Sequence, residues 1–305
     1  MEILRLENVT KKFGDMTVID NLSFSLNEGS LFGFVGKNGA GKTTTMKMIC
    51  GFLKPTAGDI YVCGEKVAYG DTRTNRFIGY LPDVPSYYSY MKPMEYLQLC
   101  GKIVGIGKDE LNTKAKEILK TVGLENANRK IGGFSRGMKQ RLGIAQALLN
   151  KPRLLICDEP TSALDPIGRK EVLEILDVIK ESTTVLFSTH ILSDVERVCD
   201  SIGVLNDGKF ALQGSLSDIK GAYNIDSAIL EPEDKGSLGA LAKKIGALKY
   251  VVDAAVNENH LIIKMEDFAQ SKNELLKFLI SNNVSIAKFQ VMEHSLENLI
   301  LEAIV

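Results

Sequence analysis

The sequence lacks any apolar run of the roughly 20 residues that a helix needs to cross a bilayer. Its first residues, MEILRLENVTKKF, alternate polar and apolar side chains and lack the apolar segment of a signal peptide. None of the five cysteines belongs to a Cys-x-x-Cys pair, and most lie in apolar stretches. These absences indicate a soluble cytoplasmic chain whose cysteines are reduced core residues.

The sequence also lacks an excess of either charge. Its 37 Lys and Arg residues against 38 Asp and Glu residues give a net charge of -1. No general attraction to nucleic acid or to an anionic membrane follows, so any anion site has to be local. A length of 305 residues with 45% hydrophobic residues is typical of two globular domains.

We expect residues 1–216 to form an α/β domain. The apolar runs SLFGFVG, RLLICDEP and TTVLFSTH indicate buried strands, and helical stretches separate them. This pattern favours a parallel sheet with helices on both faces. Further expectations are short strands over residues 2–35, a helix over KTTTMKMICGFL that ends at Lys54-Pro55, a helical region at about 86–150 with Pro93 at a first helical position, and a hairpin turn at Asn206-Asp207-Gly208.

Residues 222–305 have a different pattern, which predicts a second, small α+β domain. Short apolar segments occur in the order β-α-β-β-α-β, which is typical of a ferredoxin-like split unit. A last helix is expected from Ser295, a good N-cap residue. His260 and His294 have no functional context, and we interpret them as structural.

A phosphate-binding loop is predicted at GKNGAGKT, which follows a predicted strand, precedes a predicted helix and satisfies G-x-x-x-x-G-K-[ST]. Its three glycines allow a tight turn that points backbone N–H groups at phosphate oxygens; they are Gly36, Gly39 and Gly41. Lys42 supplies a positive charge, and the Thr43 hydroxyl is a candidate Mg²⁺ ligand.

Two further apolar strands end in candidate catalytic or metal-binding residues. LLICDEP delivers Asp158 and Glu159 to a strand end, where Asp158 is expected to hold Mg²⁺ and Glu159 to act as the general base toward water. VLFSTH delivers His190, a candidate hydrogen-bond donor to the terminal phosphate. Phe13, in KKFG, is either an aromatic that stacks on adenine or a core residue.

Four motifs then give a specific resemblance. GKNGAGKTT, FSRGMKQRL, LLICDEPTSALDP and STH occur in the order and spacing of ATP-binding cassette (ABC) transporter ATPases, over about residues 1–215. The tail, ending EHSLENLILEAI, resembles C-terminal extensions of antibiotic and peptide exporters. The resemblance implies a P-loop NTPase core with an antiparallel β subdomain and a helical subdomain, and an ATPase that uses ATP and Mg²⁺.

The resemblance also implies roles for individual residues. The nucleotide-binding set becomes Phe13, Gly36, Asn38, Gly39, Gly41, Lys42, Thr43 and Thr44, with Lys42, Glu159 and His190 catalytic. The signature residues Ser135, Arg136 and Gly137 would contact the ATP of a second chain. That chain is the same or a different ATPase subunit, in a head-to-tail dimer that encloses two nucleotides. Asp165, in the SALD segment, would lie at the junction.

Two departures from the family pattern stand out. FSRGM replaces the usual LSGGQ, so Arg136 and Met138 occupy places of Gly and Gln. Arg136 either adds charge near the phosphate or faces solvent. Asp83 occupies the place of a Gln that joins Mg²⁺ or water to the membrane partner. Asp83 is therefore a further candidate metal ligand, although an ionised Asp is shorter than Gln and cannot donate a hydrogen bond.

The favoured interpretation is an exporter ATPase subunit, peripheral at the inner face of the cell membrane through a separate permease. Residues 83–96, rich in tyrosine, are the expected docking surface. One alternative is a soluble ABC-type ATPase that acts on nucleic acid or ribosomes. A single cassette, no basic patch and no aromatic RNA-binding motif argue against it. A regulator that binds ATP without hydrolysis is another alternative, against which Glu159 argues.

Overall fold

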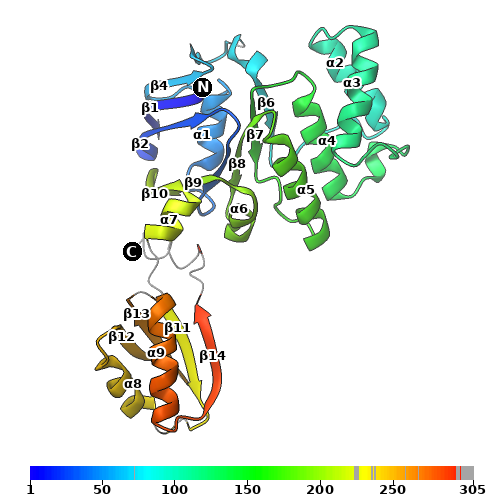
Figure 1. The fold of residues 1–305 in the computed structure, drawn as a ribbon. Coiled ribbons are helices and arrows are strands. Elements are labelled where there is room, and N and C mark those ends of the chain that lie inside the picture. Colours follow the sequence, from blue (N-terminus) through cyan, green and yellow to red (C-terminus); the bar gives the residue numbers. More distant parts are fainter. Residues whose placement is uncertain are drawn as a thin grey trace. The chain divides into compact units, whose positions relative to one another are not determined.

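The structure is a computed structural model that describes residues 1–71, 73–222, 227–234, 236, 238–257, 259–266, 268–292 and 296. The chain divides into two compact units, Met1–Ser217 and Asp218–Glu302 (Figure 1). Each unit has its own hydrophobic core. Among the described residues, no helix combines the length and the hydropathy needed to span a membrane. All five cysteines are free thiols.

The first unit is built on a six-stranded sheet in the order β10-β9-β3-β8-β7-β6. Its strands are β3 (Leu31–Val35), β6 (Ile78–Leu81), β7 (Leu154–Asp158), β8 (Thr184–Thr189), β9 (Ser201–Asn206) and β10 (Lys209–Ser215). All pairs are parallel except β9 with β10. Strands β3, β7 and β8 are buried along their whole length, which explains their continuous apolar runs. The predicted α/β class is confirmed.

The hairpin at the edge of this sheet is also confirmed. Strand β9 ends at Asn206 and β10 begins at Lys209, so Asp207 and Gly208 form the two-residue turn. Both have positive φ, 45° and 78°, as a type I′ turn requires.

The antiparallel subdomain is a four-stranded sheet in the order β2-β1-β4-β5. It comprises β1 (Glu2–Phe13), β2 (Met16–Asn27), β4 (Ala57–Val62) and β5 (Glu65–Lys66). The expectation of short strands was wrong, because β1 and β2 each run for 12 residues. The hairpin continues through several register shifts, where Asn8 and Asn21 adopt positive φ, so these irregularities bend the strands without ending them.

Helix α1 (Lys42–Ile49) contacts β4 of one sheet and β7 of the other. The expected continuation to Leu53 was wrong. Gly51 has φ 71°, its N–H donates to Met48 O, and the Phe52 N–H donates to Lys47 O. These two bonds form a Schellman motif, which ends the helix at Ile49, six residues before Pro55.

The helical region contains α2 (Pro93–Ile103), α3 (Lys108–Thr121) and α4 (Arg136–Leu148), with short 3₁₀ turns η1 (Arg73–Phe77) and η2 (Ile131–Gly133). Pro93 occupies the first turn of α2, as predicted. Helix α5 (Pro166–Ile179) packs on β8, and α6 (Leu192–Val198) packs on β3 and β8. Figure 1 shows α2, α3 and α4 beside the β6 edge of the sheet. Helix α7 (Leu216–Ala222) follows β10.

The second unit contains β11 (Ser227–Pro232), α8 (Leu238–Gly246), β12 (Val251–Asn257), β13 (His260–Met265), α9 (Phe268–Ser281) and β14 (Ile286–Met292). This is the predicted β-α-β-β-α-β order. The sheet order is β12-β13-β11-β14, and every pair is antiparallel. His260 opens β13 opposite Asn257. His294 and Ser295 lie outside the described residues, and of the helix expected from Ser295 only Leu296 is described.

Candidate active site

The functional residues of the first unit converge at the carboxyl edge of the parallel sheet. Strands β3, β7 and β8 are neighbours in that sheet, so the loops that follow them meet there. These loops and the segment after β6 enclose a cavity of about 380 Å³. It is lined by Asn38, Gly39, Gly41, Lys42, Thr43, Thr44, Asp83, Glu159, Ser162 and His190.

The phosphate-binding loop has the backbone that its glycines predict. Gly39 and Gly41 have φ of 87° and 109°, which L side chains rarely adopt. A Cβ at Gly36 would lie 2.8 Å from Leu205 O, so this position has no room for a side chain. Gly41 is the N-cap of α1 and offers no side-chain acceptor, and the first turn contains no acidic residue. The free N–H groups of the helix start can therefore bind an anion.

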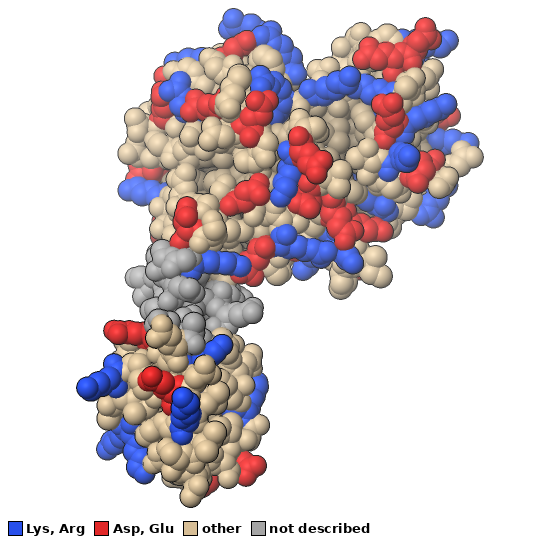
Figure 2. Space-filling model, in the orientation of Figure 1, with Lys and Arg blue, Asp and Glu red and all other residues tan. Residues whose placement is uncertain are grey.

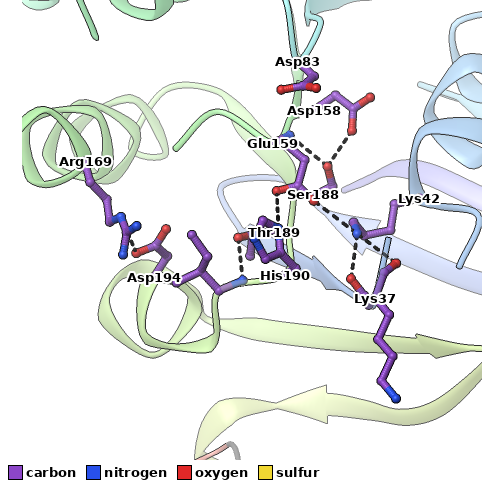
Figure 3. Close-up of polar contacts among 12 residues, drawn as sticks. Lys37, Lys42, Asp83, Asp158, Glu159, Arg169, Ser188, Thr189, His190 and Asp194 are labelled. Carbon is purple, nitrogen blue, oxygen red and sulfur yellow. Dashed lines mark hydrogen bonds and ion pairs between the residues drawn. The ribbon is translucent and has the colours of Figure 1, made fainter. Parts of the chain in front are cut away.

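Lys42 is nearly excluded from water, with 6% of its surface exposed. Its ammonium donates to Gly36 O at 2.6 Å and to Lys37 O at 3.3 Å. Its third neighbour is Glu159 Oε1, at 3.1 Å (Figure 3). The cation is thus held by the loop that it follows and by the acid at the end of β7.

Glu159 connects the strand ends. Its other carboxylate oxygen, Oε2, lies 2.9 Å from His190 Nδ1, as Figure 3 shows. The residue has φ 48°, a backbone conformation that costs free energy and is commonly found at functional sites. One carboxylate therefore contacts both Lys42 and His190, which brings together the three residues predicted to be catalytic.

Ser188 is a site residue that the sequence reasoning missed. Its hydroxyl donates to Asp158 Oδ1 at 2.7 Å and accepts from the Glu159 N–H at 3.0 Å. It is fully buried in β8, where Leu186 and Phe187 precede it and Thr189 follows it. The signal was available, because a Ser in a buried strand needs a polar partner. Ser188 holds Asp158 and the Glu159 backbone in place.

The residues present fit a divalent cation. Thr43 and Asp83 line the cavity, and Asp158, whose Oδ1 accepts from Ser188, directly precedes the lining residue Glu159. Asp83 Oδ1 is buried and has no hydrogen-bond partner among the described residues. Burial and the charge of Asp158 raise the pKa of the Asp83 carboxyl, Arg136 opposes this, and Glu159 adds to it. A hydroxyl with carboxylates and no complete cage suits Mg²⁺, which retains waters and phosphate ligands.

Phe13 lies apart from this cavity. It is 48% exposed and is not among the lining residues, so its interpretation as a core residue was wrong. The Lys11 ammonium lies 4.7 Å from the centre of its ring. The ring therefore remains available for a planar ligand outside the phosphate pocket.

The signature residues form a second helix start, separate from the cavity. Ser135 is the N-cap of α4, and its hydroxyl accepts from Met138 N–H at 3.2 Å. A Cβ at Gly137 would lie 3.7 Å from the Cα of Gly168 in α5. Ser135, Arg136 and Gly137 are absent from the lining of the phosphate pocket. Asp165 is the N-cap of α5.

Asp194 is a second residue that the sequence reasoning did not identify. It lies on α6, four positions after His190, and is 2% exposed. Its Oδ1 atom lies 4.0 Å from Arg169 Nε, on the first turn of α5 (Figure 3). Burial raises the pKa of Asp194, and the nearby Arg169 and Arg197 lower it in part. This pair joins the helix after His190 to the helix that Asp165 caps.

Comparison with known proteins follows the same division of the chain. A family model described as ABC transporter matches residues 19–162, and one described as ATP-binding protein DrrA1-3-like, C-terminal domain, matches residues 214–304. The chain is 38% identical to the uncharacterized ABC transporter ATP-binding protein YxlF of Bacillus subtilis (strain 168), over 99% of both proteins.

Two further similarities concern transport and nucleotide binding. The chain is 34% identical to the bacitracin transport ATP-binding protein BcrA of Bacillus licheniformis, over 99% of this chain and 97% of that protein. It is also similar to a solved dimeric structure of a post-hydrolysis state of the ATP-binding cassette MJ0796, bound to ADP and Pi. The identity is 28%, the TM-score is 0.63, and the match covers 70% of this chain and 99% of that one.

Proposed function

The chain belongs to the ATP-binding proteins of ABC transporters, and from this premise we propose that it hydrolyses ATP to drive export through a separate membrane-spanning partner. The observation that carries the proposal is the meeting of Lys42, Glu159 and His190 in one cavity at the end of the parallel sheet. That cavity also contains the helix start that binds phosphate.

Each residue has a distinct task in the proposed hydrolysis. The N–H groups at the start of α1 and the Lys42 ammonium bind the β- and γ-phosphates. Glu159 accepts a proton from water as the water oxygen bonds to the γ-phosphorus and the bond to the bridging oxygen breaks. His190, held by Glu159 at 2.9 Å, is placed to orient the γ-phosphate. Bound Mg²⁺, held by Thr43, Asp158 and Asp83, would neutralise phosphate charge.

We further propose that two ATPase subunits act together, head to tail. The signature helix start binds anions by the same physics as the phosphate loop, yet it lies outside the phosphate pocket of its own chain. A second chain would complete each site with Ser135, Arg136 and Gly137, and Asp165 would lie at the junction. The dimeric, ADP-bound and Pi-bound state of the MJ0796 cassette supports the pairing of two such subunits.

The proposed membrane partner would bind at residues 83–96, and the subunit would then lie at the inner face of the cell membrane. Tyr88 and Tyr90 are 53% and 67% exposed, with ring centres 5.9 Å apart. Exposed tyrosines offer a large contact area at low entropy cost.

We also propose a division of labour between the two parts of the chain, in which residues 1–216 form the ATP-binding domain and residues 222–305 form an accessory domain. The similarity to a bacitracin transport ATP-binding protein supports a role in transport.

A transport role and a nucleic-acid role predict different charge patterns. On the face shown in Figure 2, Lys and Arg are interspersed with Asp and Glu over both units. A nucleic-acid-binding face would collect cations in a patch or stripe. Nothing on this face favours the nucleic-acid alternative.

The test combines an enzyme assay with co-purification. We expect the purified subunit to release phosphate from ATP in the presence of Mg²⁺ and to co-purify with a membrane protein that has several spans of about 20 apolar residues. The Glu159→Gln protein is the control for contaminating ATPases. Co-purification with ribosomes or RNA and with no membrane protein would reject the transport proposal.

A further inference from the structure

Two of the residues that depart from the family pattern, Asp83 and Arg136, lie next to each other. Asp83 follows β6 and lines the phosphate pocket, whereas Arg136 is the first residue of α4. Arg136 Nη2 lies 3.9 Å from Asp83 Oδ1, and about half of each side chain is exposed, 48% and 47%. The candidate metal ligand of one site and the signature helix are therefore joined by opposite charges within one chain.

The main chain around Asp83 is fixed to the same helix. The buried Gln140 side chain donates from Nε2 to Asp83 O at 3.0 Å, and Tyr87 donates its hydroxyl proton to Lys139 O at 2.6 Å. Lys139 and Gln140, the two α4 residues in these hydrogen bonds, lie in the first two turns of the helix. The Asp83 backbone is therefore tied to α4, whereas its carboxyl group is not held by these two bonds.

Two cations, Arg136 and the metal ion, would share this one carboxyl group. Arg136, on α4, lies 3.9 Å from Asp83 Oδ1, and Asp83 also lines the pocket that would hold the metal ion. Asp83 Oδ1 is buried without a hydrogen bond among the described residues, so the distance of 3.9 Å leaves it incompletely satisfied. An ion pair that is half exposed adds little to folding stability, so stability does not explain the pairing.

We propose that Arg136 competes with Mg²⁺ for Asp83, so that binding of the metal and nucleotide releases the arginine at the start of the signature helix. This inference rests on the proposed function. When Asp83 turns to the metal, Arg136 becomes an unpaired cation beside Ser135 and Gly137. Its charge is then available to the phosphate of the second chain. Binding of Mg²⁺ and nucleotide at one site thus frees the signature arginine for the nucleotide of the other site. The coupling between the two binding events is reciprocal.

The first test measures the Mg²⁺ requirement of nucleotide binding by the full-length chain. A fluorescent ATP analogue reports binding while MgCl₂ is titrated, and hydrolysis is not the readout. The Arg136→Ala chain should reach half of the Mg²⁺ effect at about fivefold lower Mg²⁺, the factor for two unit charges about 4 Å apart in water. Arg136→Lys retains the charge and should stay near the original chain. Lys139→Ala removes an equal charge one turn along α4 and should leave the requirement unchanged.

The second test asks whether the effect passes through Asp83. Asp83→Asn should raise the Mg²⁺ requirement, and Arg136→Ala should have no further effect in that background. Unchanged Mg²⁺ dependence in the Arg136→Ala chain overturns the inference, because the arginine then only faces solvent. A raised requirement also overturns it, because Arg136 would then bind the nucleotide of its own chain.

Failure of the inference and failure of the proposed function would give different experimental results. Thermal unfolding without nucleotide should be alike for the Arg136, Asp83 and Lys139 variants, since a half-exposed ion pair adds little to folding stability. If the original chain binds no nucleotide, or if Lys42→Ala binds it equally well, the proposed function fails. If nucleotide binding depends on Lys42 and Mg²⁺ but not on Arg136, only the competition is rejected.

Discussion

Lys42 Nζ lies 3.1 Å from Glu159 Oε1, and both side chains are almost excluded from water, with 6% and 12% of their surfaces exposed. The cation predicted to hold phosphate and the acid predicted to activate water therefore neutralise each other. An incoming phosphate would compete with Glu159 for the Lys42 ammonium. Nucleotide binding would thus free the carboxylate, which His190 still contacts at 2.9 Å.

We predict that the Glu159→Gln protein binds ATP but hydrolyses it at least about 100-fold more slowly, the typical loss on removal of a general base. Gln keeps the shape but removes the charge that pairs with Lys42, so ATP affinity should be equal or higher. Phosphate release and equilibrium binding should be measured on one preparation. Normal turnover by this variant would remove Glu159 from the catalytic role.

We predict that Lys42→Ala destabilises the nucleotide-free chain as well as weakening ATP binding. The substitution leaves the buried Glu159 carboxylate without its cation, and breaking such a pair costs about 3 kcal/mol. Adding Glu159→Gln to Lys42→Ala removes the uncompensated charge and should recover much of that loss. Urea unfolding of the two single variants and the double variant checks this. Additive losses would show that the two residues are not coupled.

We predict that the signature acts on the nucleotide of the second chain. Ser135→Arg and Lys42→Ala chains should each be inactive alone, but a mixed dimer retains one site with both elements intact. Some ATPase activity should therefore return on mixing. Loss of the Ser135 cap costs only about 1 kcal/mol, so the variant should fold. Heterodimers that form but stay inactive would contradict the arrangement.

The sequence predicted those parts of the site that depend on local pattern. Asp158 and Glu159 were predicted at a strand end because four apolar residues precede them, and β7 ends at Asp158. The end of α1 also depends on local sequence. Gly51, with φ 71°, is the kind of residue that ends a helix, so the end of α1 at Ile49 was predictable, although the prediction placed it later, at Lys54-Pro55.

The pairings between elements could not be predicted, because nothing in the sequence specifies them. Ser188 and Asp158 are 30 residues apart, and Tyr87 donates to a carbonyl 52 residues away, at Lys139. The composition of SYYSY made all three tyrosines equal candidates for a surface. The packing against Tyr96, with ring centres 5.2 Å apart, and the hydrogen bond to Lys139 O distinguish the half-buried Tyr87 from its exposed neighbours.

We predict a pH-dependent stability difference from Asp194. Because burial raises its pKa, the folded chain holds this proton more tightly than the unfolded chain. The resulting stabilisation is complete below the unfolded pKa of about 3.9 and is lost as pH rises through the higher folded pKa. An Asn at this position does not titrate. The free energy of unfolding of Asp194→Asn should therefore rise relative to the original chain as pH increases above about 4.

Urea unfolding of both chains between about pH 4 and pH 7 checks this, and the difference should change by at most about 1.4 kcal/mol per pH unit. Asp207→Asn is the matched control, because Asp207 is exposed in a turn where Asn is equally suited. Parallel curves for Asp194→Asn and the original chain would show that the carboxyl group titrates alike in both states.

The last prediction concerns the surface around Tyr88 and Tyr90. Replacing both with Ser should leave ATP binding by the isolated subunit unchanged, because neither residue lines the phosphate pocket. Assembly with the membrane partner should weaken by about 2 kcal/mol or more if either residue is an interface hot spot. Tyr69→Ser removes a tyrosine of similar exposure, 64%, outside residues 83–96 and should assemble normally. Unchanged co-purification of the double variant, with its fold and ATP binding intact, would place the partner elsewhere.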